Sequence, residues 1–529
     1  MEAISQEVDQ IFAQWDSTVT PGCALAVVRN GEIVYKRGYG MANLEYGIPI
    51  TPATIFHIAS VSKQFTALAM TLLAHEGKLS LDEDVRKHVP ELPDFGETIT
   101  IRHLIHHTSG LRDQWELLIA AGWRMDDVIT TDDIMELVTA QQDLNFKPGE
   151  KHLYSNTGYT LQAVIVQNVT GKNLRAFCEE RMFKPLGMKN THFHDDHKMI
   201  VRNRAYSYEL DGYNHFKNAV LSYANVGATS LFTTVEDLAL WDQEFYDGKV
   251  FGKDVIEQML TRGVLNSGEQ IEYAHGLMIT DYRGLRTVGH SGGDAGYRTH
   301  LMRFPDQHFS VIVFSNLSTV APADLTKKVA DIYLADEFKE EKKEDEKVIE
   351  LPQEKLEGLT GVYFNAEDQA TYRLEMRDDI LFAAMGPGIR LEPIGERRFR
   401  FKPSPFVKLE FDDGGDDGEL KLKVRVGAKK PDVFLKVDVA VPAKEDLDEY
   451  VGEYISPELD VKYTILIQEE QLMLKRRKYG MLPLLPTVQD GFSTAEMPSN
   501  LFFKRGENGQ VTGFEVASGR VRGLRFVRQ

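Results

Sequence analysis

The chain has 529 residues, of which 42% are hydrophobic and 27% are charged, and this balance excludes a disordered or fibrous protein. The formal net charge of -19 argues against nucleic acid or an anionic membrane surface as a partner, because both attract basic protein surfaces. At roughly 150 residues per domain, the length predicts about three domains.

The N-terminus, residues 1–7, lacks the basic start and the apolar core of a secretory signal. No apolar run approaches the roughly 20 residues of a membrane span. We therefore expect a cytoplasmic protein, or a periplasmic or secreted one if a leader has been removed. Cys23 lies in an apolar strand pattern and Cys178 in a helical one, which favours two buried free thiols over a disulfide.

Two strand hairpins are predicted far apart in the chain. The first covers residues 23–35 and turns at Asn30-Gly31, and the second covers residues 299–314 and turns at Pro305. We expect the two hairpins to pair in one antiparallel sheet, so that the segment between them forms a largely helical insertion.

Ser60-Val61-Ser62-Lys63 lies where an extended segment meets an amphipathic helix. The helix is predicted from apolar residues at helical spacing and ends at a glycine: Phe65, Leu68, Ala69, Leu72, Leu73 and Gly77. A spacing of three places Ser60 and Lys63 on one helical face, close enough for the amine to take the hydroxyl proton. The free N–H groups at the helix start would also stabilise an oxyanion. The alternative is an N-cap serine followed by a solvated lysine.

After the second hairpin the sequence changes character. Residues 336–350 are rich in Lys and Glu without apolar periodicity, which predicts a charged linker. Beyond it, short alternating segments with Gly and Asp turns predict β-structure. Residues 356–363 and 447–454 share an order of apolar, Gly and Tyr positions, so this part is expected to form two small β-barrels.

Two further motifs accompany the Ser60 segment. Tyr154-Ser155-Asn156 precedes an apolar helix, and His290-Ser291-Gly292-Gly293 precedes the second hairpin. With these motifs the chain resembles the penicillin-recognising serine hydrolases, which comprise class C β-lactamases, DD-peptidases, D-aminopeptidases and related esterases. The resemblance extends over about residues 10–320 and includes the typical segments at 101–111, 183–188 and 227–234.

The resemblance implies a role for each motif residue. Ser60 would be the nucleophile, Lys63 its proton partner and Tyr154 a second proton shuttle that protonates the leaving group and activates water. Asn156 would orient Lys63 and the substrate amide. The N–H groups of Ser60 and Gly293 would form the oxyanion hole, and the substrate-binding motif would comprise His290, Ser291, Gly292 and Gly293. No cofactor and no metal are implied.

His290 stands where many β-lactamases and penicillin-binding proteins have lysine. An unperturbed histidine is mostly neutral at pH 7, so strong recognition of a substrate carboxylate, and with it efficient β-lactamase activity, is less expected. The histidine form also occurs in DD-peptidases, D-aminopeptidases and esterases of this family. Asp294 has two interpretations, a partner for a substrate ammonium group or a plain turn aspartate.

These observations predict an α/β (α+β) catalytic domain over residues 1–335, with an antiparallel sheet flanked by helices and a large helical insertion. A charged linker (336–350), a lipocalin-like β-barrel (351–443) and a second β-barrel (444–529) would follow, an arrangement that resembles D-aminopeptidases. The expected activity is that of a serine hydrolase acting on a small peptide, amide or ester substrate, either D-aminopeptidase-like or an esterase. The alternatives are a class C-like β-lactamase or DD-carboxypeptidase, and a non-catalytic binding protein that kept the fold. The oligomeric state stays open.

Overall fold

A computed structural model describes residues 2–340, 346–386, 388–402, 404–413, 419–426, 430–476, 478, 480–494 and 499–529. The chain forms two compact units. The first comprises Met1–Gln114, Arg124–Thr139 and Phe146–Lys342, and the second comprises Trp115–Trp123, Ala140–Asn145 and Lys343–Gln529.

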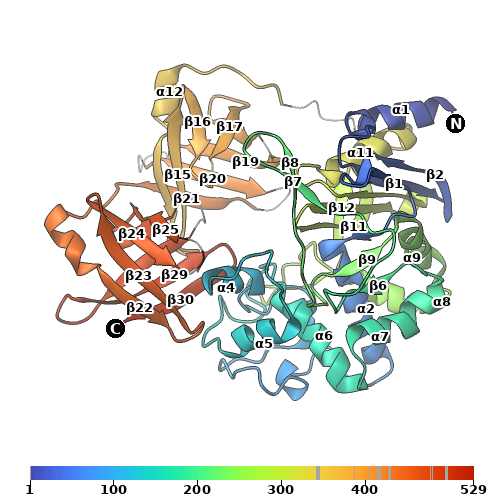
Figure 1. The fold of residues 1–529 in the computed structure, drawn as a ribbon, viewed down its shortest axis with the longest axis horizontal. Coiled ribbons are helices and arrows are strands. Elements are labelled where there is room, and N and C mark those ends of the chain that lie inside the picture. The colour runs from blue at the N-terminus through green and yellow to red at the C-terminus, as the bar shows by residue number, and fades with distance from the viewer. Residues whose placement is uncertain are drawn as a thin grey trace. The chain divides into compact units, whose positions relative to one another are not determined.

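The first unit is built on a six-stranded sheet with the order β10-β11-β12-β13-β1-β2 (Figure 1). Its strands are β1 (Cys23–Arg29), β2 (Glu32–Tyr39), β10 (Met278–Tyr282), β11 (Leu285–Asp294), β12 (Tyr297–Phe304) and β13 (Phe309–Ser315). Strands β1 and β13 pair antiparallel, with Cys23 opposite Ser315. The prediction that the two hairpins share one antiparallel sheet is therefore confirmed.

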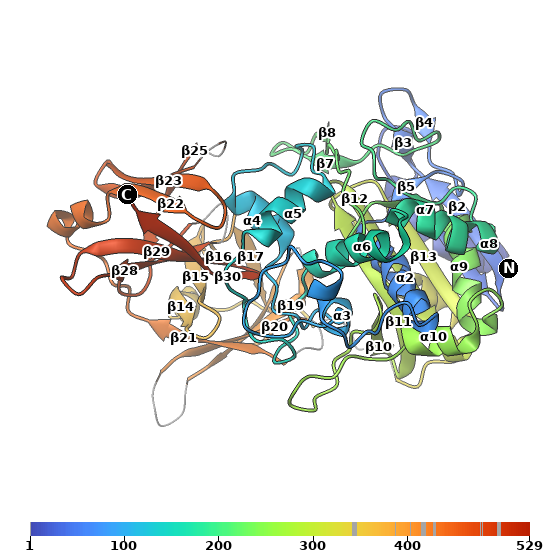
Figure 2. The ribbon, with the colours of Figure 1, turned by 90° about the horizontal axis from the view of Figure 1, so that it is seen from below.

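Helices cover the sheet and fill the insertion. Helices α1 (Glu2–Phe12) and α11 (Pro322–Tyr333) contribute Val8, Phe12 and Val329 to a core with Leu25 and Val27 of β1. The alternate residues of β1 face the other side of the sheet, where α9 (Val235–Asp247) packs against β1 and β13. Between the hairpins lie α2 (Lys63–His75), α3 (Ile101–Ile105), α5 (Thr131–Thr139), α6 (Thr157–Thr170), α7 (Leu174–Cys178), α8 (Lys184–Leu186) and α10 (Lys253–Met259) (Figure 2). Most helices of this unit thus lie in the predicted insertion, joined there by short strands and irregular segments, and both cysteines are free and buried.

The second unit contains a closed antiparallel barrel. Its strands are β14 (Gly361–Asn365), β15 (Ala370–Arg377), β16 (Ile380–Ala383), β17 (Ile389–Pro393), β18 (Arg398–Phe401), β19 (Ser404–Asp412), β20 (Lys421–Val426) and β21 (Asp432–Val437). Strand β14 pairs with β21 and closes the ring. The interior is apolar and includes Tyr363, Leu409 and Phe411.

A nine-stranded sheet follows, with the order β25-β24-β23-β22-β30-β29-β28-β27-β26. Its strands are β22 (Gly452–Ser456), β23 (Val461–Gln468), β24 (Gln471–Arg476), β25 (Gly480–Pro483), β26 (Leu485–Pro486), β27 (Gly491–Ser493), β28 (Asn500–Arg505), β29 (Val511–Ser518) and β30 (Val521–Arg528). The two edge strands, β25 and β26, are separated in the chain by Leu484 alone, so the sheet must curl back on itself into a nearly closed barrel.

The predicted repeat has a structural counterpart in the two barrels. In the first, the hydroxyl of Tyr363 donates to the carbonyl of Leu359 at 2.8 Å, and in the second, the hydroxyl of Tyr454 donates to the carbonyl of Tyr450 at 2.7 Å. Each bond reaches four residues back and joins the first strand of its barrel to the helical turn before it. The shared order of Gly and Tyr therefore marks equivalent positions.

The second unit also takes up α4 (Gln114–Ala120) and residues 140–145. Glu116 accepts from the backbone N–H of Arg520, and its carboxylate lies 3.0 Å from the Arg520 Nε. The hydroxyl of Tyr463 donates to the carbonyl of Ala120 at 2.8 Å. The domain boundaries at 335, 350 and 443 stay predictions, and residues 341–345 of the predicted linker lie outside the described residues.

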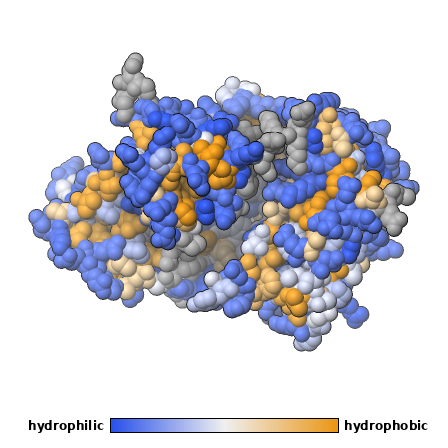
Figure 3. Space-filling view, turned by 90° about the horizontal axis from the view of Figure 1, so that it is seen from above, coloured by the Kyte–Doolittle hydropathy of each residue, from blue (hydrophilic) through white to orange (hydrophobic). Residues whose placement is uncertain are grey.

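The surface in Figure 3 is mainly hydrophilic, with separate apolar patches. Among the described residues, no helix combines the length and the apolar character needed to cross a membrane.

Candidate active site

Ser60 lies in η2 (Ala59–Ser62), the turn that leads directly into α2. Ala59 has a φ of 49°, a left-handed conformation that costs a non-glycine residue about 1–3 kcal/mol. Two hydrogen bonds hold it there: its N–H donates to His57 Nδ1 at 3.2 Å, and its carbonyl accepts from Ser62 Oγ at 2.5 Å. The turn thus leaves Ser60 partly exposed at the start of a buried helix.

The side chain of Lys63 is buried, and its Nζ atom lies at the centre of the site. Its Nζ lies 3.0 Å from Ser60 Oγ, 2.8 Å from Asn156 Oδ1 and 2.6 Å from the carbonyl oxygen of Ala228. It also lies 4.9 Å from the centre of the Tyr154 ring. Asn156 and Ala228, which lie 93 and 165 positions from Lys63 in sequence, therefore meet Ser60 at one nitrogen.

Asn156 is held in one orientation by Asp113. The Asp113 Oδ2 accepts from the backbone N–H of Asn156 at 2.7 Å and from its side-chain Nδ2 at 2.8 Å. Because the amide nitrogen points to Asp113, the amide oxygen must face Lys63. Asp113 was not predicted from the sequence, because it belongs to none of the three motifs; the one available signal is its place just after the family segment 101–111.

Tyr154 is packed in an aromatic cluster on the other side of Lys63. Its ring centre lies 4.0 Å from that of His107, and 6.1 Å from those of Tyr273 and His290. Burial lowers the pKa of His107 well below its usual value, so this histidine packs as a neutral ring. The structure therefore brings Tyr154 and Lys63 together, as the sequence motifs predict.

His290 is held neutral. Its Nδ1 lies 2.6 Å from the carbonyl oxygen of Ser291, which can only accept, so Nδ1 carries the proton and Nε2 accepts from the Tyr273 hydroxyl at 3.1 Å. Burial lowers the pKa of His290 to about 4. At neutral pH this position therefore offers no cation. Tyr273, which fixes the tautomer, was not identified from sequence.

A glycine at position 292 lets β11 approach the Ser60 turn. A Cβ on Gly292 would lie 2.3 Å from the carbonyl oxygen of Ile58 and 2.4 Å from Thr299 Oγ1, so only glycine fits there. Pairing with β10 ends at Gly289, and residues 290–294 pair with β12 alone. Ser291 and Gly293 are exposed, so this stretch presents a free strand edge beside Ser60.

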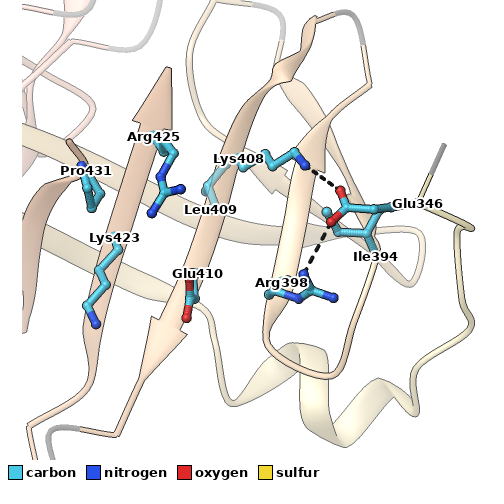
Figure 4. Close-up of a pocket in the computed structure, with 9 residues that line it drawn as sticks. All are labelled: Glu346, Ile394, Arg398, Lys408, Leu409, Glu410, Lys423, Arg425 and Pro431. Carbon is cyan, nitrogen blue, oxygen red and sulfur yellow. Dashed lines mark hydrogen bonds and ion pairs between the residues drawn. The ribbon is translucent and has the colours of Figure 1, made fainter. Parts of the chain in front are cut away.

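A pocket of about 160 Å³ on the outer face of the first barrel differs from the Ser60 site in the side chains that line it (Figure 4). Glu346 accepts there from Lys408 at 2.7 Å and Arg398 at 3.3 Å. Lys423 pairs with Asp412 at 2.9 Å. The pocket has charged pairs at its rim but no nucleophile with a proton partner, so the Ser60 site is the candidate active site.

The sequence and the fold of this chain are similar to those of several known proteins. The family model described as "Beta-lactamase" matches residues 8–334. The chain is 29% identical over 436 residues to penicillin-binding protein 4* of Bacillus subtilis (strain 168), covering 78% of this chain and 95% of that protein. It is 28% identical over 302 residues to a D-aminopeptidase of Gluconobacter oxydans (strain 621H), covering 57% of each. The octameric penicillin-binding protein homologue from Pyrococcus abyssi matches with a TM-score of 0.58 and 26% identity, over 82% of this chain and 99% of that one.

Proposed function

This chain belongs to the beta-lactamase family, and from that membership we propose that it is a serine hydrolase that cleaves amide or ester bonds through an acyl-enzyme. The observation that carries the proposal is the buried Lys63 Nζ, 3.0 Å from the partly exposed Ser60 Oγ. A buried amine beside a hydroxyl is the arrangement that activates a serine.

The fixed acceptors around Lys63 explain how it would take a proton. A neutral amine has two hydrogens and one lone pair. Asn156 Oδ1 and the Ala228 carbonyl can accept the two hydrogens, at 2.8 and 2.6 Å, and the lone pair then points to the Ser60 hydroxyl. Lys63 would accept that proton as Ser60 Oγ attacks the substrate carbonyl carbon.

The tetrahedral oxyanion would accept hydrogen bonds from the N–H groups of Ser60 and Gly293. As it collapses, the bond from carbon to the leaving nitrogen or oxygen breaks, and Tyr154 donates a proton to the leaving group. Tyr154 regains its proton from Lys63. A water molecule then attacks the acyl carbon and gives a proton to the same pair of groups. The bond from this carbon to Ser60 Oγ breaks, that proton passes to Oγ, and the acid is released.

The proposed substrates are small amides, peptides and esters, with D-aminopeptidase-like or esterase activity. Two features support this choice: a relative at 28% identity is a D-aminopeptidase, and the neutral His290 offers no cation to a substrate carboxylate. A class C-like β-lactamase would depend more on such a cation. A DD-carboxypeptidase stays an alternative, because the histidine form also occurs in DD-peptidases of this family. The complete proton-transfer set argues against a non-catalytic binding protein, which has no use for it.

The test is hydrolysis of a chromogenic panel by the native protein, Ser60→Ala and the control Ser267→Ala, which alters an exposed loop serine. The panel contains D- and L-aminoacyl p-nitroanilides, short p-nitrophenyl esters and nitrocefin. We expect Ser60→Ala to lose at least about 10³-fold in kcat while Ser267→Ala stays active. A fully active Ser60→Ala would refute the serine mechanism. A native protein inactive on the whole panel would favour the binding-protein alternative.

A further inference from the structure

Asp294 is the last residue of β11 and directly follows Gly293. Because successive strand residues alternate between faces, its side chain lies on the same face as those of His290 and Gly292. The side chain is buried except for 15% of its surface. It therefore lies at the end of the free strand edge, next to the proposed oxyanion hole.

The side chains that contact this carboxylate, Thr229 and His57, position it but do not neutralise its charge. Thr229 Oγ1 donates to Asp294 Oδ2. His57 Nδ1 lies 4.0 Å from Oδ2, but it already accepts from the N–H of Ala59 at 3.2 Å and so carries no proton. Burial lowers the pKa of His57 well below its usual value, which keeps the ring neutral. The contact between His57 and Asp294 is therefore not an ion pair.

The nearest basic side chains, Arg298 and Lys63, form their hydrogen bonds with groups other than Asp294. Arg298 Nη1 donates to the carbonyl oxygens of Ala295 at 2.9 Å and Tyr297 at 2.7 Å. Lys63 is held by Ser60, Asn156 and Ala228. In the part of the chain that the structure describes, no lysine or arginine forms an ion pair with Asp294.

Burial raises the pKa of Asp294 to about 6, while the hydrogen bond from Thr229 acts to lower it. A substrate ammonium group would favour the ionised form of this carboxylate. Asp294 is thus a largely buried carboxylate that forms no ion pair with a lysine or arginine among the described residues, beside the point where the substrate carbonyl would bind. A cation from the substrate would fit there.

On the basis of the proposed function, we infer that Asp294 binds the α-ammonium group of the substrate's acyl residue. The α-carbon is bonded to the carbonyl carbon, so when the carbonyl oxygen lies on the Gly293 N–H, the α-substituents lie beside the next residue of the strand. The site would then select amides, peptides and esters of amino acids with a free amino group. Acyl groups that lack the amine would leave the buried carboxylate unpaired.

The experiment compares two substrates that differ only in the ammonium group, D-alanyl p-nitroanilide and propionyl p-nitroanilide. We expect the ratio of their kcat/KM values, alanyl over propionyl, to fall at least about tenfold in Asp294→Asn, mainly through a higher KM for the alanyl substrate. The matched control is Asp281→Asn, which removes an exposed carboxylate from β10 opposite Arg286 and should keep the ratio. An equal loss on both substrates, or an unchanged ratio, would overturn the inference.

A second measurement does not depend on turnover. The same two anilides are titrated by calorimetry into Ser60→Ala and into Ser60→Ala with Asp294→Asn. We expect the alanyl compound to bind at least about tenfold more tightly than the propionyl compound, and the second substitution to remove that preference. Equal binding of both compounds to Ser60→Ala would overturn the inference. This result is distinct from failure of the proposed function, which would appear as absent hydrolysis by the native protein.

Discussion

Asp113 fixes the direction of the Asn156 side-chain amide, because one Asp113 oxygen accepts from the Asn156 backbone N–H at 2.7 Å and from its Nδ2 at 2.8 Å. The amide oxygen is thereby turned to Lys63, at 2.8 Å. A chain of hydrogen bonds thus runs from Asp113 through Asn156 and Lys63, which are all buried, to the partly exposed Ser60, and each group in it orients the next one.

Asp113→Ala should leave the Asn156 amide without this partner. We expect kcat to fall about 10- to 100-fold and the free energy of unfolding to fall by about 1–3 kcal/mol, because a buried N–H loses its acceptor. Kinetics on the best substrate of the panel and thermal unfolding measure the two effects. The control Asp132→Ala removes an exposed carboxylate from α5 and should change neither quantity substantially. A fully active Asp113→Ala would show that Asn156 is oriented by other groups.

Lys63→Met keeps much of the side-chain volume and removes the proton acceptor. We expect kcat to fall at least about 10³-fold, since general-base assistance and the activated nucleophile are lost together. Lys87→Met, which changes a lysine that is 64% exposed, is the control. Circular dichroism checks that both proteins are folded. Retention of most of the activity in a folded Lys63→Met would contradict the role given to this amine.

Gly292→Ala and Gly293→Ala form a matched pair. A Cβ at 292 would lie 2.3 Å from the Ile58 carbonyl and force β11 away from the Ser60 turn, whereas a Cβ at 293 would meet only Arg298, at 3.5 Å. We expect Gly292→Ala to lower the free energy of unfolding by about 1–3 kcal/mol or more and to lose most of its activity. Gly293→Ala should remain close to native stability. Equal melting temperatures for the two variants would mean that β11 can move away from the Ser60 turn without loss of stability.

Stability should decrease as the pH falls from about 6.5 to 4. Burial lowers the pKa of His106, His192, His194 and His290 to about 4. Between pH 4 and 6.5 the unfolded chain binds more protons at these residues than the folded one, so protonation favours unfolding, by up to ~3 kcal/mol for each group. Asp294, with its pKa raised to about 6, acts in the opposite direction, as do Asp237 and Glu244, whose pKa values burial also raises. Carboxylates paired with basic groups, such as Glu76 with its pKa lowered to about 2 by Arg181, act in the same direction as the histidines.

The measurement for this prediction is the free energy of unfolding as a function of pH for the native protein and His106→Asn. The variant should show a flatter dependence over this interval, whatever its stability at neutral pH. His215→Asn, which changes a histidine that is 78% exposed, should keep the native slope. Parallel curves for the native protein and His106→Asn would exclude His106 as a source of the acid sensitivity.

Much of the fold was predictable because it depends on local patterns. Apolar runs with turn signals at Asn30-Gly31 and Pro305 predicted the strands, and β1 does pair with β13. The shared Gly and Tyr order predicted two barrels, and both tyrosines make the same backward hydrogen bond. The assignment of residues 115–123 and 140–145 to the second unit was not predictable, because it rests on pairs such as Glu116 with Arg520, which are 404 positions apart.

By itself, the sequence determined the chemical groups: a serine three residues before a lysine at a helix start, a tyrosine and an asparagine before a second helix, and a histidine with two glycines in a strand. The tertiary structure alone decided which groups complete the site. The Asp113 carboxylate and the Tyr273 hydroxyl belong to no motif, and the Ala228 carbonyl lies in the 227–234 segment, to which the sequence assigned no role. Their contacts form only when distant segments pack together. The physical reason is that spacing along a helix or strand fixes local neighbours, whereas burial and hydrogen-bond partners depend on the packed fold.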